Sequence, residues 1–255
     1  MKNTKEIIIA HRGESYDAPE NTLAAIKLAW ERGAVSVEVD VHMTQDGQIV
    51  VIHDADTSRV ANRKMILKKS LYADLKKLDV GSFKHIKWKG EQIPLLQEVL
   101  DTVPHAGRLI IEIKSNVDLL PRLKILLEKS KLKTDQIEII AFDSKVLAEA
   151  KQIMPKYKML WLLDLDYYLP WWLIFISKKR LIKKVKTLHL EGVNVWDGKL
   201  LTKDFICNFK KAGLLVYTWT VNNPTRAKQL IEYEIDAITT DRAAWITEQI
   251  NKQIK

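Results

Sequence analysis

Two histidines, two carboxylates and an arginine lie at or beside short apolar runs near the start of the chain. His11 and Arg12 follow an isoleucine-rich run. Glu38 and Asp40 alternate with valines, and His53 ends a third apolar run. Imidazoles can carry protons, carboxylate oxygens suit a hard divalent cation, and an arginine can bind an anion. This set of side chains indicates metal-assisted hydrolysis of a phosphate ester.

A hairpin is expected to bring three of these side chains to one face. Asp46-Gly47 between two apolar runs is a signal for a two-residue hairpin loop. Counting outward from that loop by equal steps pairs Asp40 with His53, and cross-strand partners point to the same face. Glu38 shares this face because it lies two residues from Asp40.

The elements that must position these residues form an alternating α/β pattern. Strand-like runs separated by helix-like segments favour a parallel sheet, and eight such units in a chain of this length fit a (β/α)8 TIM barrel. The hairpin adds one strand after the second, and residues 54–107 are interpreted as a small insertion near the barrel mouth. The expected barrel strands are 6–11, 35–41, 108–114, 137–142, 158–163, 192–196, 214–221 and 236–240.

Several helix starts are marked by polar residues. Asn21 is expected to cap a helix that stops at Gly33, and Thr202 to cap another. Asn223-Pro224 should open a third, with proline at the first helical position.

Composition limits the classes of protein. The chain has 255 residues, 47% of them hydrophobic, and no linker rich in glycine, serine or proline, which predicts a single domain over residues 1–255. The only cysteine, Cys207, excludes an internal disulfide, and its aromatic neighbours predict a buried, inert thiol. The first apolar run is too short for a secretory signal or a membrane span, so we expect a cytoplasmic protein.

The chain is basic, which favours anionic partners. Lysine and arginine together number 41 and the acidic residues 32, so the net charge is 41 − 32 = +9. Phosphate esters, anionic lipids and nucleic acids all fit this charge. No aromatic and basic motif of a known nucleic-acid reader is present, so we expect no nucleic-acid partner.

An ordered series of motifs between about residues 6 and 246 resembles the glycerophosphodiester phosphodiesterase family. The motifs are His11-Arg12-Gly13, Pro19-Glu20-Asn21-Thr22, Glu38-x-Asp40, Thr44-x-Asp46-Gly47, His53-Asp54, Leu78-Asp79-Val80-Gly81-Ser82, Ile93-Pro94, Ile111-Glu112-Ile113-Lys114, Val216-Tyr217-Thr218-Trp219-Thr220-Val221-Asn222 and Ile238-Thr239-Thr240-Asp241-Arg242. Residues 55–60 and Ala243 depart from the family pattern, which affects the shape of the mouth more than the chemistry.

This resemblance implies a barrel related to phospholipase C catalytic domains. It implies hydrolysis of glycerophosphodiesters to sn-glycerol 3-phosphate and an alcohol through a cyclic phosphate, with one histidine as base and the other as acid. Oxygen ligands suit Mg²⁺ or Ca²⁺. By position, the resemblance assigns catalysis to His11 and His53, the cation to Glu38, Asp40 and Glu112, phosphate contacts to Arg12 and Lys114, and a wall of the site to Trp219.

Alternatives remain open at this stage. The same site could serve a lysophospholipase D-like or phospholipase C-like enzyme acting on a membrane lipid, or a non-catalytic barrel that binds phosphate or lipid. Residues 161–186 combine aromatic residues with a basic run, which suits contact with an anionic membrane, a packed barrel helix or loop, or an oligomer contact. His42, nearer the hairpin tip, is a weaker candidate for contact with substrate.

Overall fold

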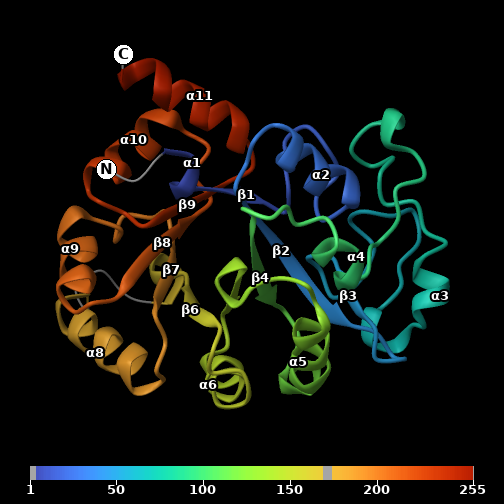
Figure 1. Ribbon diagram of the computed structural model, residues 1–255, viewed down its shortest axis with the longest axis horizontal. Coiled ribbons are helices and arrows are strands. Elements are labelled where there is room, and N and C mark those ends of the chain that lie inside the picture. Colours follow the sequence, from blue (N-terminus) through green and yellow to red (C-terminus); the bar gives the residue numbers. More distant parts are fainter. Residues whose placement is uncertain (1–3, 169–173, 255) are drawn as a thin grey trace.

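The computed structural model describes residues 4–168 and 174–254, and within them a parallel barrel is surrounded by helices (Figure 1). The strands are β1 (Ile8–His11), β2 (Ser36–Met43), β3 (Ile49–Val51), β4 (Arg108–Ile113), β5 (Ile137–Ala141), β6 (Lys158–Leu163), β7 (Gly192–Trp196), β8 (Leu215–Trp219) and β9 (Ala237–Thr240). The α-helices are α1 (Thr4–Ile7), α2 (Leu23–Glu31), α3 (Tyr72–Leu75), α4 (Leu96–Leu100), α5 (Leu120–Lys129), α6 (Ser144–Ile153), α7 (Leu165–Tyr168), α8 (Ile174–Thr187), α9 (Lys203–Lys211), α10 (Pro224–Glu232) and α11 (Ala243–Ile254). Short 3-10 helices are η1 (Leu67–Lys69), η2 (Ile86–Trp88), η3 (Val117–Leu119) and η4 (Thr134–Gln136).

The sheet closes on itself. The strand order is β1-β9-β8-β7-β6-β5-β4-β2-β3, and β1 also pairs in parallel with β2. Among the strands of the described residues, only β3 is antiparallel, and it pairs with β2 outside the ring. The predicted (β/α)8 barrel with a hairpin strand after its second strand is confirmed, although residues 4–7 form α1 rather than the start of the first strand.

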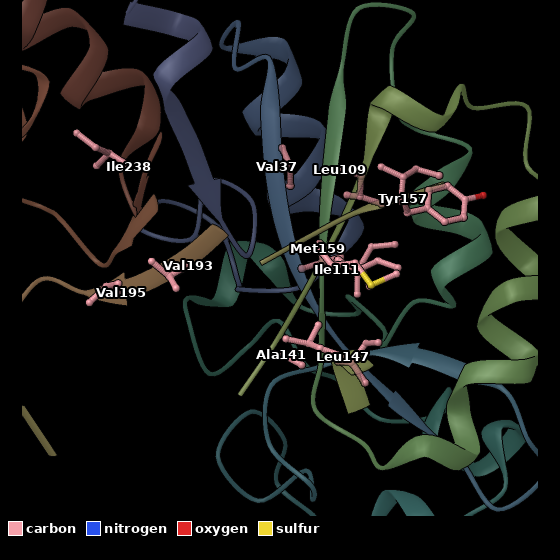
Figure 2. Close-up of a cluster of buried hydrophobic side chains, with 14 of the residues drawn as sticks. Val37, Leu109, Ile111, Ala141, Leu147, Tyr157, Met159, Val193, Val195 and Ile238 are labelled. Atoms are coloured by element: carbon pink, nitrogen blue, oxygen red, sulfur yellow. The ribbon is translucent and has the colours of Figure 1, made fainter. Parts of the chain in front are cut away.

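Two layers of buried apolar side chains, one outside and one inside the ring of strands, stabilise the barrel. Outward-facing residues of the strands pack against the helices, and Figure 2 shows Ala141 of β5 beside Leu147 of α6 in this cluster. A smaller inner cluster, including Ile9 and Ile110, fills the barrel. Because alternate strand residues face the inside, the inner positions at the carboxyl ends of β1, β2 and β4 carry polar side chains above this cluster.

The hairpin differs from the prediction by one residue in register. Val41 pairs with Val51, so Asp40 lies opposite Ile52, whose amide donates to the Asp40 carbonyl at 3.0 Å. The reason is a three-residue loop, in which the Gly47 amide donates to the Thr44 carbonyl and only Gly47 of the Asp46-Gly47 pair has a positive φ, +73°. A type I turn followed by a left-handed glycine adds a residue to one strand and shifts the pairing.

The helix starts are partly as predicted. Thr202 and Asn223 cap α9 and α10 through their side chains. The predicted cap at Asn21 is wrong, because Thr22 caps α2 and Asn21 adopts a positive φ of 59° with its side chain turned toward β2. Cys207 is exposed rather than buried, since it lies on the face of α9 away from the core.

Residues between β3 and β4 build a second small core beside the barrel. Val50, Leu67, Leu75 and Ile93 belong to one buried cluster in this region. The Val51 amide donates to the Pro94 carbonyl at 2.9 Å, which ties the segment to the hairpin. None of the helices in the described part of the chain is both long and apolar enough to cross a bilayer.

The tryptophan-rich stretch at residues 169–173 lies outside the described residues, as do the side chains of residues 167–177. Membrane contact through residues 161–186 therefore stays a prediction. Nearby, the side chain of Trp161 donates to the Phe142 carbonyl at 2.9 Å, and Lys184 stacks on its ring.

Candidate functional site

Strand register brings the predicted chemistry together at the carboxyl ends of three neighbouring strands. His11 of β1 is the partner of Glu38 in β2, and Asp40 is the partner of Glu112 in β4. Parallel strands in register place such residues side by side on the inner face. The alternation that predicted a shared face for Glu38 and Asp40 is thus borne out.

Glu38, Asp40 and Glu112 form one buried acidic cluster. A ligand oxygen from each lies within 4.8 Å of the others. Glu38 Oε1 and Asp40 Oδ1 are buried without a hydrogen-bond partner. Buried carboxylate oxygens rarely stay unpaired, because desolvation without a partner is costly. Oxygen ligands at this spacing fit a divalent cation such as Mg²⁺ or Ca²⁺.

The acids perturb one another, which is the sign of uncompensated negative charge. Burial and the neighbouring Asp40 and Glu112 raise the pKa of Glu38 well above its usual value. Burial and Asp40 raise the pKa of Glu112 to about 7. Burial alone would also raise the pKa of Asp40, but Arg12 and Lys114 hold it below its usual value.

Arg12 and Lys114 are the two cations that border this cluster. Arg12 Nε lies 3.1 Å from Asp40, and Lys114 Nζ lies 2.8 Å from Glu112 and 3.6 Å from Asp40. Three acids against two cations leave a net charge of −1 when all are ionised. Arg12 and Lys114, the residues predicted to contact phosphate, therefore lie beside the acids. A bound cation would neutralise the remaining negative charge.

His11 is held by a carboxylate from the last barrel strand. Its Nδ1 lies 2.6 Å from a carboxylate oxygen of Asp241. Burial alone would raise the pKa of Asp241, but the contacts of this carboxylate with His11, Asn222 and Ser15 lower the pKa to about 2. An ionised Asp241 must accept a proton from Nδ1, so Nε2 is left facing Glu38 at 4.0 Å.

His53 is held in the same way on the opposite side of the cluster. Its Nδ1 lies 2.7 Å from Asp54, and its Nε2 lies 3.0 Å from Lys114 Nζ. Burial, together with the nearby charges of Arg12 and Lys114, lowers the pKa of His53 although Asp40 opposes this shift, so the neutral form of the ring is favoured. His53 reaches the site despite the shifted register because β3 ends at Val51, beyond which strand alternation no longer applies.

His42 supports the backbone of His53. Its Nε2 lies 3.0 Å from the His53 carbonyl, and its ring is buried. The contact is with the protein backbone rather than with the acidic cluster.

A charged network around these groups was not foreseen as part of the site. Arg59 donates to Asp54 at 2.6 Å and to both oxygens of Glu20, and Arg12 donates to the same Glu20 at 2.8 Å. Arg59 thus links the carboxylate behind His53 to the guanidinium beside Asp40. Glu20 and Asp54 belong to motifs visible in the sequence, but nothing in their spacing indicates that Arg59 joins them.

Asn21 fixes the central carboxylate. Its Nδ2 donates to Asp40 Oδ2 at 2.8 Å, and its Oδ1 accepts from the Asp40 amide at 3.1 Å. Asparagine tolerates the left-handed backbone conformation that this placement needs. The side chain expected to cap α2 instead orients a candidate ligand.

Trp219 lies at the end of β8 in an aromatic wall. Its ring contacts Phe142 and Trp196 edge to face, with centroids 5.5 and 5.0 Å apart, and Lys114 Nζ lies 5.8 Å from the Phe142 ring. Phe142 and Trp196 were not singled out in the sequence, although each follows the inward alternation of its strand. The mouth therefore has a charged half on β1, β2 and β4 and an aromatic half on β5, β7 and β8.

Comparisons with known proteins identify the family of the chain. The family model of the "Glycerophosphoryl diester phosphodiesterase family" matches residues 11–244. A glycerophosphodiester phosphodiesterase of Caldanaerobacter subterraneus is 33% identical over 241 residues, covering 93% of this chain and 94% of the relative. One from Bacillus subtilis is 29% identical, covering 92% of this chain and 83% of the relative.

Solved structures of phosphodiesterases are similar to this chain over almost its whole length. An Oleispira antarctica phosphodiesterase, solved with the product sn-glycerol-3-phosphate, superposes with a TM-score of 0.86 at 26% identity over 96% of each chain. A glycerophosphodiester phosphodiesterase from Parabacteroides distasonis gives a TM-score of 0.79 at 25% identity over 98% of each chain. The chain is an enzyme of the hydrolase class, and it belongs to the glycerophosphoryl diester phosphodiesterase family.

Proposed function

We propose that this enzyme hydrolyses glycerophosphodiesters to sn-glycerol 3-phosphate and an alcohol, using one divalent cation and two histidines. The observation that carries the proposal is the buried acidic cluster of Glu38, Asp40 and Glu112, beside which lie His11 and His53, each with its Nδ1 held by an aspartate. The product bound to the Oleispira antarctica phosphodiesterase supports the choice of product.

The three carboxylates would hold the cation, which is Mg²⁺ or Ca²⁺. When bound, it supplies positive charge for the non-bridging oxygens of the diester. Glu38 Oε1 and Asp40 Oδ1, buried and without hydrogen bonds, are the donor atoms best suited to it. Arg12 and Lys114 lie where they would add charge-assisted hydrogen bonds to the same phosphate.

The histidines would move the protons. One takes the proton from a glycerol hydroxyl as that oxygen attacks phosphorus, and the other gives a proton to the departing alkoxide. An attacking hydroxyl that is already part of the bound substrate gains a large effective molarity, in favourable cases worth about 7–11 kcal/mol. Water then opens the cyclic phosphate with the two roles exchanged. Asp241 and Asp54 keep each ring turned so that Nε2 faces the substrate.

The test measures sn-glycerol 3-phosphate released from glycerophosphocholine and glycerophosphoethanolamine, and choline released from lysophosphatidylcholine, each with EDTA, Mg²⁺ or Ca²⁺. We expect turnover of glycerophosphocholine and glycerophosphoethanolamine in the presence of Mg²⁺ or Ca²⁺ and almost none with EDTA. His11→Ala and His53→Ala should each lose about 10²–10⁴ in kcat. Near-native turnover by both folded variants would refute the roles given to the histidines. Turnover of lysophosphatidylcholine alone would favour a lysophospholipase D-like enzyme, and substrate binding without turnover would favour a binding barrel.

A further inference from the structure

An exposed loop of the insertion combines large apolar side chains with lysines. Within residues 82–90, Phe83 is 43% and Ile86 68% exposed. The same nine residues contain Lys84, Lys87, Lys89 and no acidic residue. Single exposed apolar residues are common on protein surfaces. Two large ones within one basic loop that has no acidic residue form a patch that indicates a binding surface.

Backbone hydrogen bonds hold the conformation of the loop in which Phe83 and Ile86 are exposed. At its base the Val80 amide donates to the Glu91 carbonyl at 2.9 Å, and inside it the Trp88 amide donates to the His85 carbonyl at 2.9 Å. A Cβ on Gly81 would lie 1.9 Å from the Trp88 carbonyl oxygen, so the loop closes tightly on glycine.

The loop is anchored at the mouth of the barrel. Lys84 Nζ donates to the Ser15 carbonyl at 2.8 Å, and the Trp88 indole donates to the Asp17 carbonyl at 3.2 Å. Ser15 in turn contacts Asp241, the carboxylate that holds His11. The apolar patch therefore lies a few contacts from the proposed catalytic histidine.

Tyr16 extends the patch. Its ring is 53% exposed, with Arg242 stacked on it at 4.0 Å and Lys84 at 5.8 Å. Aromatic rings beside cations suit the boundary between lipid headgroups and acyl chains.

We propose that loop 82–90 docks this enzyme on anionic lipid surfaces, with Phe83 and Ile86 entering the headgroup boundary and Lys87 and Lys89 contacting lipid phosphates. A second copy of the chain fits poorly, because a symmetric contact would set lysines against lysines. An acid-free basic loop carrying protruding apolar tips matches the charge of an anionic bilayer, which also offers an apolar layer beneath the charge. Docking there would turn the barrel mouth toward the membrane.

The experiment is co-sedimentation of the full chain with phosphatidylcholine vesicles and with vesicles of equal parts phosphatidylcholine and phosphatidylglycerol, at 50 and 500 mM NaCl. We expect binding to the anionic vesicles at low salt and strong loss at high salt. Each lysine near the surface should contribute about fivefold, so Lys87→Gln with Lys89→Gln should weaken binding about 25-fold. Phe83→Ser with Ile86→Ser should weaken it about tenfold or more.

Matched controls use exposed residues on the side and at the opposite end of the barrel. Ile125→Ser removes an apolar side chain of similar exposure from α5, and Lys129→Gln with Lys131→Gln removes the same charge. Both should bind like the wild type. All variants should keep the turnover of soluble glycerophosphocholine, so a failure of lipid docking is distinguished from a failure of the proposed function.

Four results would overturn the proposal. The first is that the wild type does not bind anionic vesicles at 50 mM NaCl. The second is that the loop variants and the control variants lose vesicle binding equally. The third is that the chain self-associates without lipid and that Phe83→Ser with Ile86→Ser abolishes this self-association. The fourth is binding that survives the loop changes but is lost on Lys179→Gln with Lys183→Gln, which would move the lipid contact to α8.

Discussion

Each site histidine has one ring nitrogen fixed by an aspartate. His11 is held by Asp241 and His53 by Asp54, at 2.6 and 2.7 Å. The aspartates come from different places in the chain, one following β9 and the other adjoining His53. Both leave Nε2 as the nitrogen that can exchange a proton with substrate.

Removing the charge behind either histidine should slow the reaction while leaving the fold in place. Asp241→Asn and Asp54→Asn should each lower kcat at least about tenfold, because an amide no longer fixes the tautomer or stabilises the imidazolium. Steady-state kinetics with glycerophosphocholine, with circular dichroism to verify folding, tests this expectation. Asp143→Asn, which changes the exposed cap of α6, is the matched control. If all three variants had the same kcat, the positioning role would be wrong.

The acidic cluster should make the metal-free protein less stable as pH rises. The pKa of Glu112 is raised from 4.5 to about 7. Between these values the folded state binds more protons than the unfolded state, so stability falls with increasing pH and the penalty is complete above 7. In EDTA at pH 8, Glu112→Gln should therefore stabilise the protein, on the order of 2 kcal/mol. At pH 4 it should have little effect.

Thermal unfolding of both proteins in EDTA across pH 4–8 measures this difference. A Glu112→Gln variant less stable than the wild type at pH 8 would show that Lys114 already compensates the carboxylate.

At the scale of elements, the turn after β1 positions both His11 and Arg12. Arg12 and Gly13 both have positive φ, 56° and 82°, and the Arg12 amide donates to Glu38 at 3.1 Å. A Cβ on Gly13 would lie 2.5 Å from the backbone of Ala25 in α2. Only glycine allows this turn and helix to approach so closely.

Gly13→Ala should therefore be strongly destabilising, by about 3–5 kcal/mol from strain and overpacking together. Gly47→Ala is a matched control, since Gly47 has a φ of +73° but nothing within 4 Å of the added Cβ. It should cost only about 1–2 kcal/mol. Urea unfolding of the two variants separates the effects, and equal costs would contradict the close packing of this turn.

The sequence predicts those elements whose signals are local. Apolar strand-like runs separated by helix-like segments located the barrel strands within a few residues, and the side chains of Thr202 and Asn223 indicated the helix caps that the structure contains. The hairpin register was missed because the choice between loop types depends on one backbone torsion at Asp46. The role of Asn21 was missed because its partner, Asp40, is on another strand.

At the scale of the molecule, the site depends on barrel closure. Asp241 lies 230 residues from His11, and the two meet only because β9 and β1 are neighbours in the ring. The position of Asp241 in a motif could suggest that it is important, but its pairing with His11 depends on the tertiary structure. The Glu20–Arg59 bridge likewise depends on how the insertion packs against the barrel. Side chains placed by strand alternation were predictable, whereas those placed by loops and by the insertion were not.

The most direct measurement is calorimetric titration of Mg²⁺ and Ca²⁺ into the metal-stripped protein and its Asp40→Asn variant at pH 8. We predict that the wild type binds one cation per chain and that the variant, which keeps the size of the side chain but loses its charge, binds at least about tenfold more weakly. Wild-type protein that binds neither cation, or a variant that binds as tightly as the wild type, would contradict a metal site built from Glu38, Asp40 and Glu112.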